Sequence, residues 1–329
     1  MRVLIVKLSS LGDVVHALPV IHDMRAAIPG ISIDWVVEPG FAPLLQRVDG
    51  IEGIVELPLR RWRKAWWTAV VRAEFAAFRR RLRETSYDAV IDLQGLTKSV
   101  LVARLARGPS FGLAHRTDGS SYEAPARWLV DHPLMVPRHI HALDRSRQLA
   151  GSALAYAPDG QVQFGLHALQ PHAEADRRPL MVFVHGTSRD DKLWPEADWI
   201  TLGGRLVAAG WRIALPHAGA SELARATRIA QAIGADCTVW PALGLDKLVD
   251  RMATASGVIG VDSGLSHIAV ALGLPHVQLY NFPTSWRTGP QASHGHRHQV
   301  AIEAGPGQQS PTLAAVWQAW QLVSAAATG

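Results

Sequence analysis

The chain contains 329 residues, of which 48% are apolar, and carries a formal net charge of +5. This size and composition predict a globular protein that is large enough for two cores. No uninterrupted apolar run approaches the roughly 18 residues that span a bilayer, and the single Cys237 excludes an internal disulfide framework. Because the first residues lead directly into a strand without a signal-peptide pattern, we expect a soluble, cytoplasmic protein.

The positive charge is concentrated in the first half of the chain. Up to Phe164 there are 21 basic and 16 acidic side chains, whereas the remainder contains 12 of each. Between Arg60 and Arg83, nine basic side chains accompany a single acidic one, Glu74. This imbalance predicts that the first half meets an anionic partner.

The chain begins with a pattern typical of an α/β domain: a buried strand at 2–6, a turn of small residues and an amphipathic helix. Turns of this kind that bind phosphate are rich in glycine, because glycine lets backbone amides approach the phosphate oxygens. Here the turn contains one glycine, Gly12, and carries Asp13, whose negative charge would repel a phosphate. The turn therefore predicts a role other than phosphate binding.

Strands and helices alternate through the rest of the first half. We expect Pro19 to kink the first helix, and we expect an irregular polar segment at 111–138. The expected strands lie at 31–37, 53–57 and 88–93, and the expected helices at 62–84, 96–107 and 139–155. Such alternation predicts βαβ units in a mostly parallel sheet.

The alternation restarts after a segment at 157–179 that is interrupted by proline and glycine and that we interpret as the linker between domains 1–165 and 166–329. The expected strands lie at 180–184, 211–215 and 257–261, and the expected helices at 195–210, from Ser221, at 245–255 and from Gly264. We expect a terminal helix at 311–327, with Ser310 as its cap and Pro311 as its first residue, that packs either on the second domain or back on the first. Two doubly wound sheets are the simplest fold, and ligands of such sheets bind beyond the carboxyl ends of the strands.

The clearest polar cluster of the second half follows the strand at 257–261. The strand stops at Asp262, and a helix begins near Gly264 with His267 on its first turn. The backbone amides around Ser263 and the helix dipole would attract a diphosphate. The alternative is an ordinary turn in which Asp262 caps the helix.

Two further clusters follow neighbouring strands. In the first, hydroxyls of Thr187 and Ser188 can donate to phosphate oxygens, and Lys192 can offset the charge of a leaving group; a solvated loop is the alternative. In the second, Glu222 either accepts hydrogen bonds from a ribose or is an acidic residue that favours a helix N-terminus.

The basic segment at 60–83 also contains Trp62, Trp66 and Trp67, and tryptophan is typical of membrane interfaces. A phosphorylated lipid would suit both features, whereas a solvated helix face is the simpler alternative. Nucleic acid is a rival partner, but no recognition helix or RNA-binding signature accompanies the cations. The histidines at 294, 296 and 298 are closely spaced but fall on an expected polar loop, and the remaining histidines lack the spacing of metal ligands, so we expect no metal site.

Four ordered motifs, RVLIVKLSSLGD (2–13), DLQGLTKS (92–99), DDKLWP (190–195) and VDSGLSH (261–267), resemble those of the lipopolysaccharide heptosyltransferases. The run RRWRKAW (60–66) is most similar to the heptosyltransferase I group, which adds the first heptose of the inner core. The resemblance implies a GT-B fold, in which two Rossmann-like domains face each other across a cleft. It also implies inverting transfer of L-glycero-D-manno-heptose from ADP-heptose to a Kdo residue of Kdo-lipid A, without an essential metal or other cofactor.

The resemblance assigns a role to Asp13. A sugar hydroxyl is a poor nucleophile near neutral pH, so a carboxylate within about 3 Å would serve as its general base. The resemblance places donor contacts at Thr187, Ser188, Lys192, Glu222, Leu243, Asp262, Ser263, Gly264 and His267. We expect acceptor contacts at Ser10, Gly12, Arg60, Arg61, Arg63, Lys64 and His139. The segment 280–287 departs from the glycine-rich turn common in the family.

These expectations place the chain at the cytoplasmic face of the inner membrane, held there peripherally by its basic first domain. One alternative is a relative that adds the second or a later heptose. A nucleotide-binding oxidoreductase or epimerase is disfavoured by the absent glycine fingerprint. A non-catalytic protein that binds anionic lipid or nucleotide is a further alternative.

Overall fold

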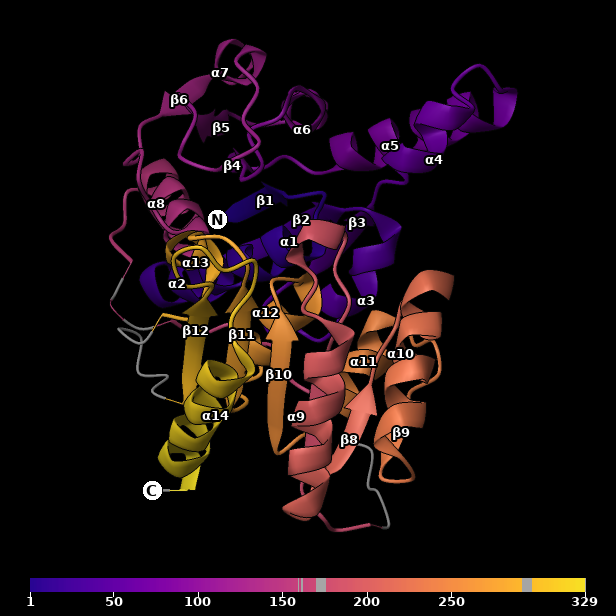
Figure 1. Cartoon of the computed structure of the whole chain (residues 1–329). Coiled ribbons are helices and arrows are strands. Elements are labelled where there is room, and N and C mark those ends of the chain that lie inside the picture. Colours follow the sequence, from indigo (N-terminus) through magenta and orange to yellow (C-terminus); the bar gives the residue numbers. More distant parts are fainter. Residues whose placement is uncertain (159, 161, 170–175, 292–297, 329) are drawn as a thin grey trace. The chain divides into compact units, whose positions relative to one another are not determined.

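A computed structural model describes residues 1–158, 160, 162–169, 176–291 and 298–328 (Figure 1). The chain divides into two compact units, Met1–Gly165 and Leu166–Gly329. Each unit contains a six-stranded sheet in which every described strand pairing is parallel. The prediction of two doubly wound sheets is therefore confirmed.

The strands of the first unit have the order β3-β2-β1-β4-β5-β6. They are β1 (Arg2–Val6), β2 (Ser32–Val37), β3 (Gly53–Glu56), β4 (Ala89–Asp92), β5 (Ser110–Leu113) and β6 (His132–Leu134). The chain winds outward from β1 in one direction and from β4 in the other. The loops that follow these two central strands therefore diverge, which is the position where ligands bind in such sheets.

Helices cover both faces of this sheet. They are α1 (Leu11–Ala17), α2 (Pro19–Ala27), η1 (Pro39–Phe41), α3 (Ala42–Leu45), α4 (Leu59–Lys64), α5 (Ala69–Glu84), α6 (Thr97–Ala103), α7 (Pro125–Leu129) and α8 (Ala142–Leu154). Helix α8 packs on α1 and α2, whereas α4, α5 and α6 lie on the other face (Figure 1). There, Phe78 and Val102 join Leu4 and Val6 in one apolar cluster, because alternate side chains of a strand point to the same face.

Three expectations for the first unit were wrong in detail. The helix expected at 62–84 is two helices, because the chain turns at 65–68 and the Thr68 hydroxyl accepts a hydrogen bond from Val71 N at the start of α5. The segment 111–138 contains the end of β5, α7 and β6. Pro19 is the first residue of a separate helix, so it divides α1 from α2 where only a kink was expected.

The second unit repeats the topology, with the order β12-β11-β10-β7-β8-β9. Its strands are β7 (Leu180–Val184), β8 (Arg212–Leu215), β9 (Cys237–Val239), β10 (Gly257–Val261), β11 (His276–Tyr280) and β12 (Gln299–Glu303). Its helices are η2 (Asp190–Lys192), α9 (Glu196–Ala208), α10 (Ala220–Ile233), α11 (Leu245–Met252), α12 (Gly264–Ala271), α13 (Ser285–Thr288) and α14 (Leu313–Thr328). The central strands are β7 and β10.

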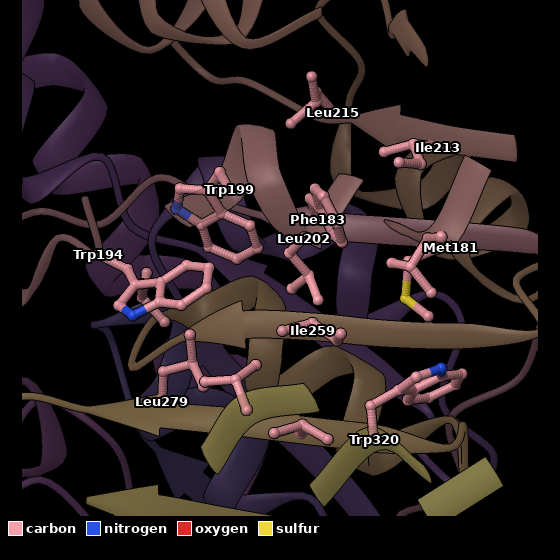
Figure 2. Close-up of a cluster of buried hydrophobic side chains, with 14 of the residues drawn as sticks. Met181, Phe183, Trp194, Trp199, Leu202, Ile213, Leu215, Ile259, Leu279 and Trp320 are labelled. Carbon is pink, nitrogen blue, oxygen red and sulfur yellow. The ribbon is translucent and has the colours of Figure 1, made fainter. Parts of the chain in front are cut away.

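Tryptophan side chains fill much of the core of this unit. Trp194 and Trp199 meet edge to face with ring centroids 4.9 Å apart, and Trp320 of α14 lies in the same cluster (Figure 2). The terminal helix, for which packing on either domain was expected, thus packs on β11 and β12. Among the described residues, none of the helices combines the length and apolarity needed to cross a membrane.

Two predicted helix starts in this unit were displaced. Helix α10 begins at Ala220 after Gly219, so Ser221 lies in its first turn and is not the N-cap. Helix α14 begins at Leu313, where the Thr312 hydroxyl accepts a hydrogen bond from Ala315 N. In both helices the N-cap lies one or two residues from the predicted position. Sequence pattern predicts a helix start only to within one or two residues.

Candidate functional site

The carboxylate of Asp13 lies at the carboxyl edge of the first sheet, on the first turn of α1. Its Oδ2 accepts hydrogen bonds from the backbone N–H and the hydroxyl of Ser10, at 3.1 and 2.8 Å. The side chain is 42% exposed, so the carboxylate can be reached from solvent. The turn thus orients a carboxylate and leaves it accessible.

A buried lysine lies beside this carboxylate. Lys7 is 2% exposed, and its Nζ donates to the carbonyl oxygen of Leu93 at 2.9 Å and lies 3.8 Å from Asp13 Oδ1. Burial opposes ionisation of Asp13, but the Lys7 ammonium and the hydrogen bonds from Ser10 outweigh it, so the pKa of Asp13 lies below its usual value. Asp13 is therefore ionised near neutral pH and can accept a proton.

The neighbouring loop after β4 is organised by a second carboxylate. Asp92 is 1% exposed and accepts hydrogen bonds from Gln94 N at 3.0 Å and from the Ser99 hydroxyl at 3.0 Å. Burial raises its pKa to about 6. The Gln94 side chain in turn accepts a hydrogen bond from Leu8 N at 2.8 Å, which ties this loop to the loop after β1.

Sequence reasoning did not assign roles to Lys7 and Arg145, which both lower the pKa of Asp13. Arg145 of α8 is 7% exposed and donates to the Thr117 hydroxyl at 3.2 Å. A charged residue directly after a buried strand was the available signal for Lys7. Arg145 had no comparable signal, because only the packing of α8 on α1, α2 and the strands β4 to β6 brings it to this edge.

The residues predicted to contact the acceptor all follow the carboxyl ends of strands in the first sheet: Ser10, Gly12, Arg60, Arg61, Arg63, Lys64 and His139. Ser10 bonds Asp13 directly, and Gly12 lies in the first turn of α1. The backbone N–H of Arg60 donates to Glu38 Oε1, which follows β2, at 3.1 Å. His139 lies in the loop before α8, with its Nδ1 3.3 Å from Asp118 Oδ2.

The cations of α4 do not share one environment. Arg61 forms an ion pair with Glu74 of α5 at 2.5 Å, whereas Arg63 and Lys64 are exposed at the end of α4. Trp62 is only 6% exposed, packs on Phe78 and donates to Glu74, so its predicted place at a membrane interface was wrong.

In the second unit, the loops after β7 and β10 meet through Lys192 and Asp262. Lys192 Nζ donates to Asp262 Oδ2 at 2.6 Å, and His267 Nε2 lies 3.5 Å from Oδ1. Burial opposes ionisation of Asp262, but His267 and Lys192 hold its pKa well below the usual range. This cluster therefore combines an ionised carboxylate with an ammonium and an imidazole.

The predicted hydroxyl groups surround the same junction. Thr187 Oγ1 donates to the carbonyl oxygen of Asp262 at 3.1 Å, while Ser188 is exposed. Ser263 precedes α12, whose first residue is Gly264, and the Ser263 hydroxyl makes no cap hydrogen bond. These donors and the first turn of α12 form a polar surface that suits an anion.

Glu222 lies beside this surface, and Leu243 lies farther along the sheet. Glu222 Oε2 accepts a hydrogen bond from Ala218 N at 2.7 Å, and a Cβ at Gly186 would come within 2.7 Å of its carboxyl carbon. Glycine at 186 therefore permits the contact between Glu222 and the loop after β7. Leu243 is half-buried in the loop after β9, which is the edge strand two positions from β7.

Sequence reasoning also missed Asn281, whose side-chain amide donates to the carbonyl oxygens of Asp191 and Leu193 at 2.9 and 3.0 Å. Asn281, which follows β11, thereby fixes the loop that carries Lys192. Among the residues described, no group of three or more metal-binding side chains comes together. His294 and His296 lie outside the described residues.

Comparison with known proteins identifies the family to which this chain is similar. The family model of glycosyltransferase family 9 (heptosyltransferase) matches residues 75–315. The chain is 42% identical over 285 residues to lipopolysaccharide heptosyltransferase 1 of Salmonella typhimurium, which covers 85% of this chain and 88% of that protein. It is 27% identical over 315 residues to lipopolysaccharide heptosyltransferase 2 of Escherichia coli, which covers 89% and 86%.

The fold gives the same result. The solved structure of E. coli heptosyltransferase WaaC with ADP is similar to this chain, with a TM-score of 0.86 and 38% identity, covering 97% of this chain and 98% of that one. The predicted GT-B architecture and the predicted resemblance are thereby confirmed. The chain belongs to glycosyltransferase family 9, the heptosyltransferase family.

Proposed function

We propose that this chain transfers L-glycero-D-manno-heptose from ADP-heptose to a Kdo residue of Kdo-lipid A, as a step of lipopolysaccharide inner-core biosynthesis. The main support is the 42% identity to lipopolysaccharide heptosyltransferase 1 over 85% of the chain. A heptosyltransferase that adds the second heptose is the closest alternative, but identity to such a relative is 27%.

In this proposal, the second unit binds the donor. Lys192 and the first turn of α12 bind the diphosphate, with Thr187, Ser188 and Ser263 as hydroxyl donors. Glu222 binds the ribose and Leu243 lines the adenine site. Because Lys192 is ion-paired with Asp262, an incoming phosphate exchanges one anionic partner of the ammonium for another.

The first unit binds the acceptor and activates it. Asp13 accepts the proton of the attacking hydroxyl while the oxygen bonds to the anomeric carbon and the bond to ADP breaks. Attack opposite the leaving group inverts the anomeric configuration. We propose that the reaction needs no metal and no cofactor besides the sugar nucleotide, because cationic side chains can stabilise the departing diphosphate.

The test is heptose transfer by the purified chain with ADP-heptose and Kdo-lipid A. Asp13→Asn removes the base with little change in shape, so we expect turnover to fall by about 10² or more. ADP binding, measured by calorimetry, should stay unchanged because the proposed donor residues lie in the other unit. Unchanged turnover would remove Asp13 as the base, and transfer only to an acceptor that already carries heptose would favour the alternative.

Two further measurements test the proposed inversion and the proposed independence from metal. The anomeric coupling in the NMR spectrum of the product reports inversion, and turnover after treatment with EDTA reports any need for a divalent metal. Location at the cytoplasmic face of the inner membrane is part of the same proposal, since the acceptor is a lipid. We do not expect nucleic acid to be a partner of this chain.

A further inference from the structure

We infer that α4, α5, α6 and α7 together form a membrane-binding face, and that Trp66 and Trp67 insert among the headgroups of an anionic phospholipid bilayer. This inference rests on the proposed function, which requires access to a lipid-linked acceptor, and it goes further by naming the inserted side chains. The bilayer itself is the partner, whether or not acceptor is present.

Large apolar side chains are exposed along this helical layer. Trp66 and Trp67 lie between α4 and α5, are 69% and 59% exposed, and touch edge to face with centroids 6.3 Å apart. Val70, in the first turn of α5, is 64% exposed, and Trp128 of α7 is 70% exposed. Exposed apolar patches of this kind are typical of surfaces that bind a membrane or another protein.

The layer is continuous in the fold. Val100 of α6 packs with Ala126 of α7, and Val102 of α6 joins the cluster that contains Trp62 and Phe78. Helices α4 to α7 therefore cover one face of the first sheet, and Figure 1 shows the connection between α4 and α5 projecting from it. The exposed tryptophans at 66, 67 and 128 therefore all come from this one helical layer.

The same helical layer carries cations, as an anionic bilayer requires: Arg63 and Lys64 are exposed just before Trp66, and further arginines lie along α5. Helix α5 carries a shallow groove formed by Phe75, Ala76, Arg79, Arg80 and Arg83. A groove lined by apolar and guanidinium side chains fits the glycerol and phosphate region of a phospholipid. Helix α5 contains two acidic side chains: Glu74 forms an ion pair with Arg61, and Glu84 is the last residue of the helix.

Buried contacts between α4 and α5 hold the connection that carries Trp66 and Trp67 in place. Trp62 packs on Phe75 and Phe78 and donates to Glu74 Oε2 at 2.6 Å, which joins α4 to α5. The same network leaves Trp66 and Trp67 outside the core. Tryptophan with one apolar ring system and one N–H donor favours the interface between headgroups and acyl chains.

The test compares the full chain with Trp66→Ser/Trp67→Ser in binding to vesicles of phosphatidylethanolamine and phosphatidylglycerol without acceptor. We expect binding to fall by about tenfold or more in the variant, and to be weak for phosphatidylcholine vesicles. Trp286→Ser is the matched control, because Trp286 is an exposed tryptophan (38%) of the second unit. Vesicles of brominated lipid should quench the fluorescence of the full chain more than that of the double variant.

Transfer to a water-soluble, deacylated acceptor separates this inference from the proposed function. The double variant should keep that activity, whereas failure of the full chain to transfer heptose would count against the proposed function alone. Equal vesicle binding by the full chain and the double variant would overturn the inference. Self-association of the full chain that the double variant loses would overturn it too. The exposed tryptophans would then bind a second copy of the chain and not a bilayer.

Discussion

Replacing Lys7 by methionine tests whether a buried ammonium keeps Asp13 ionised. The substitution preserves most of the apolar stem and removes the charge 3.8 Å from Asp13 Oδ1. At this separation a charge pair is worth about 1 kcal/mol in water and about 4 kcal/mol at an effective dielectric constant of about 20. Because Asp13 is 42% exposed, we expect an effect of about 1 to 2 kcal/mol on its proton affinity.

The sign of the effect follows from the role of the base. Asp13 must be deprotonated to accept a proton, so activity falls as the pH drops through its pKa. Without the ammonium the pKa of Asp13 rises, and the acid limb of kcat/KM moves to higher pH. The carbonyl of Leu93 also loses its donor, which costs about 1 to 3 kcal/mol of folding stability.

The assay is kcat/KM for heptose transfer from about pH 5 to about pH 9, with a urea unfolding curve for each variant. Lys98→Met, a change of the same kind on α6, is the control and should leave the acid limb in place. An acid limb that does not move in Lys7→Met would mean that Lys7 carries no charge in the folded protein. The reasoning about Asp13 would then fail, whatever the loss of stability.

Three further predictions concern the two units. Arg147→Met leaves Asp23 as an unpaired carboxylate that is 1% exposed, so urea unfolding should show a loss of about 3 to 5 kcal/mol, most of which Asp23→Val restores in the double variant. The pKa of Asp92 is raised to about 6, so the wild type should lose stability relative to Asp92→Asn as the pH rises from about 4 to about 7, and parallel curves would contradict this. Lys192→Met should weaken ADP binding by about tenfold or more in calorimetry, whereas Lys247→Met should not.

Much of the fold could be predicted from local pattern. The strands β1, β7 and β10 were predicted at their observed residues, because buried parallel strands appear as continuous apolar runs between turns. The polar motifs after these strands identified the family, which the comparisons confirm. The short edge strands β6 and β9 carry few apolar residues, and the sequence did not reveal them.

The sequence by itself determined the alternation of strands and helices, the motifs and the excess of cations, because each depends on neighbouring residues along the chain. Only the tertiary structure decided that Trp62 is buried while Trp66 is exposed, and that Lys7 lies beside Asp13. Residues 7 and 93 meet because β1 and β4 are neighbours in the sheet, 86 positions apart in the chain. Such a pairing depends on which strands associate and which faces they bury, and local sequence pattern carries neither.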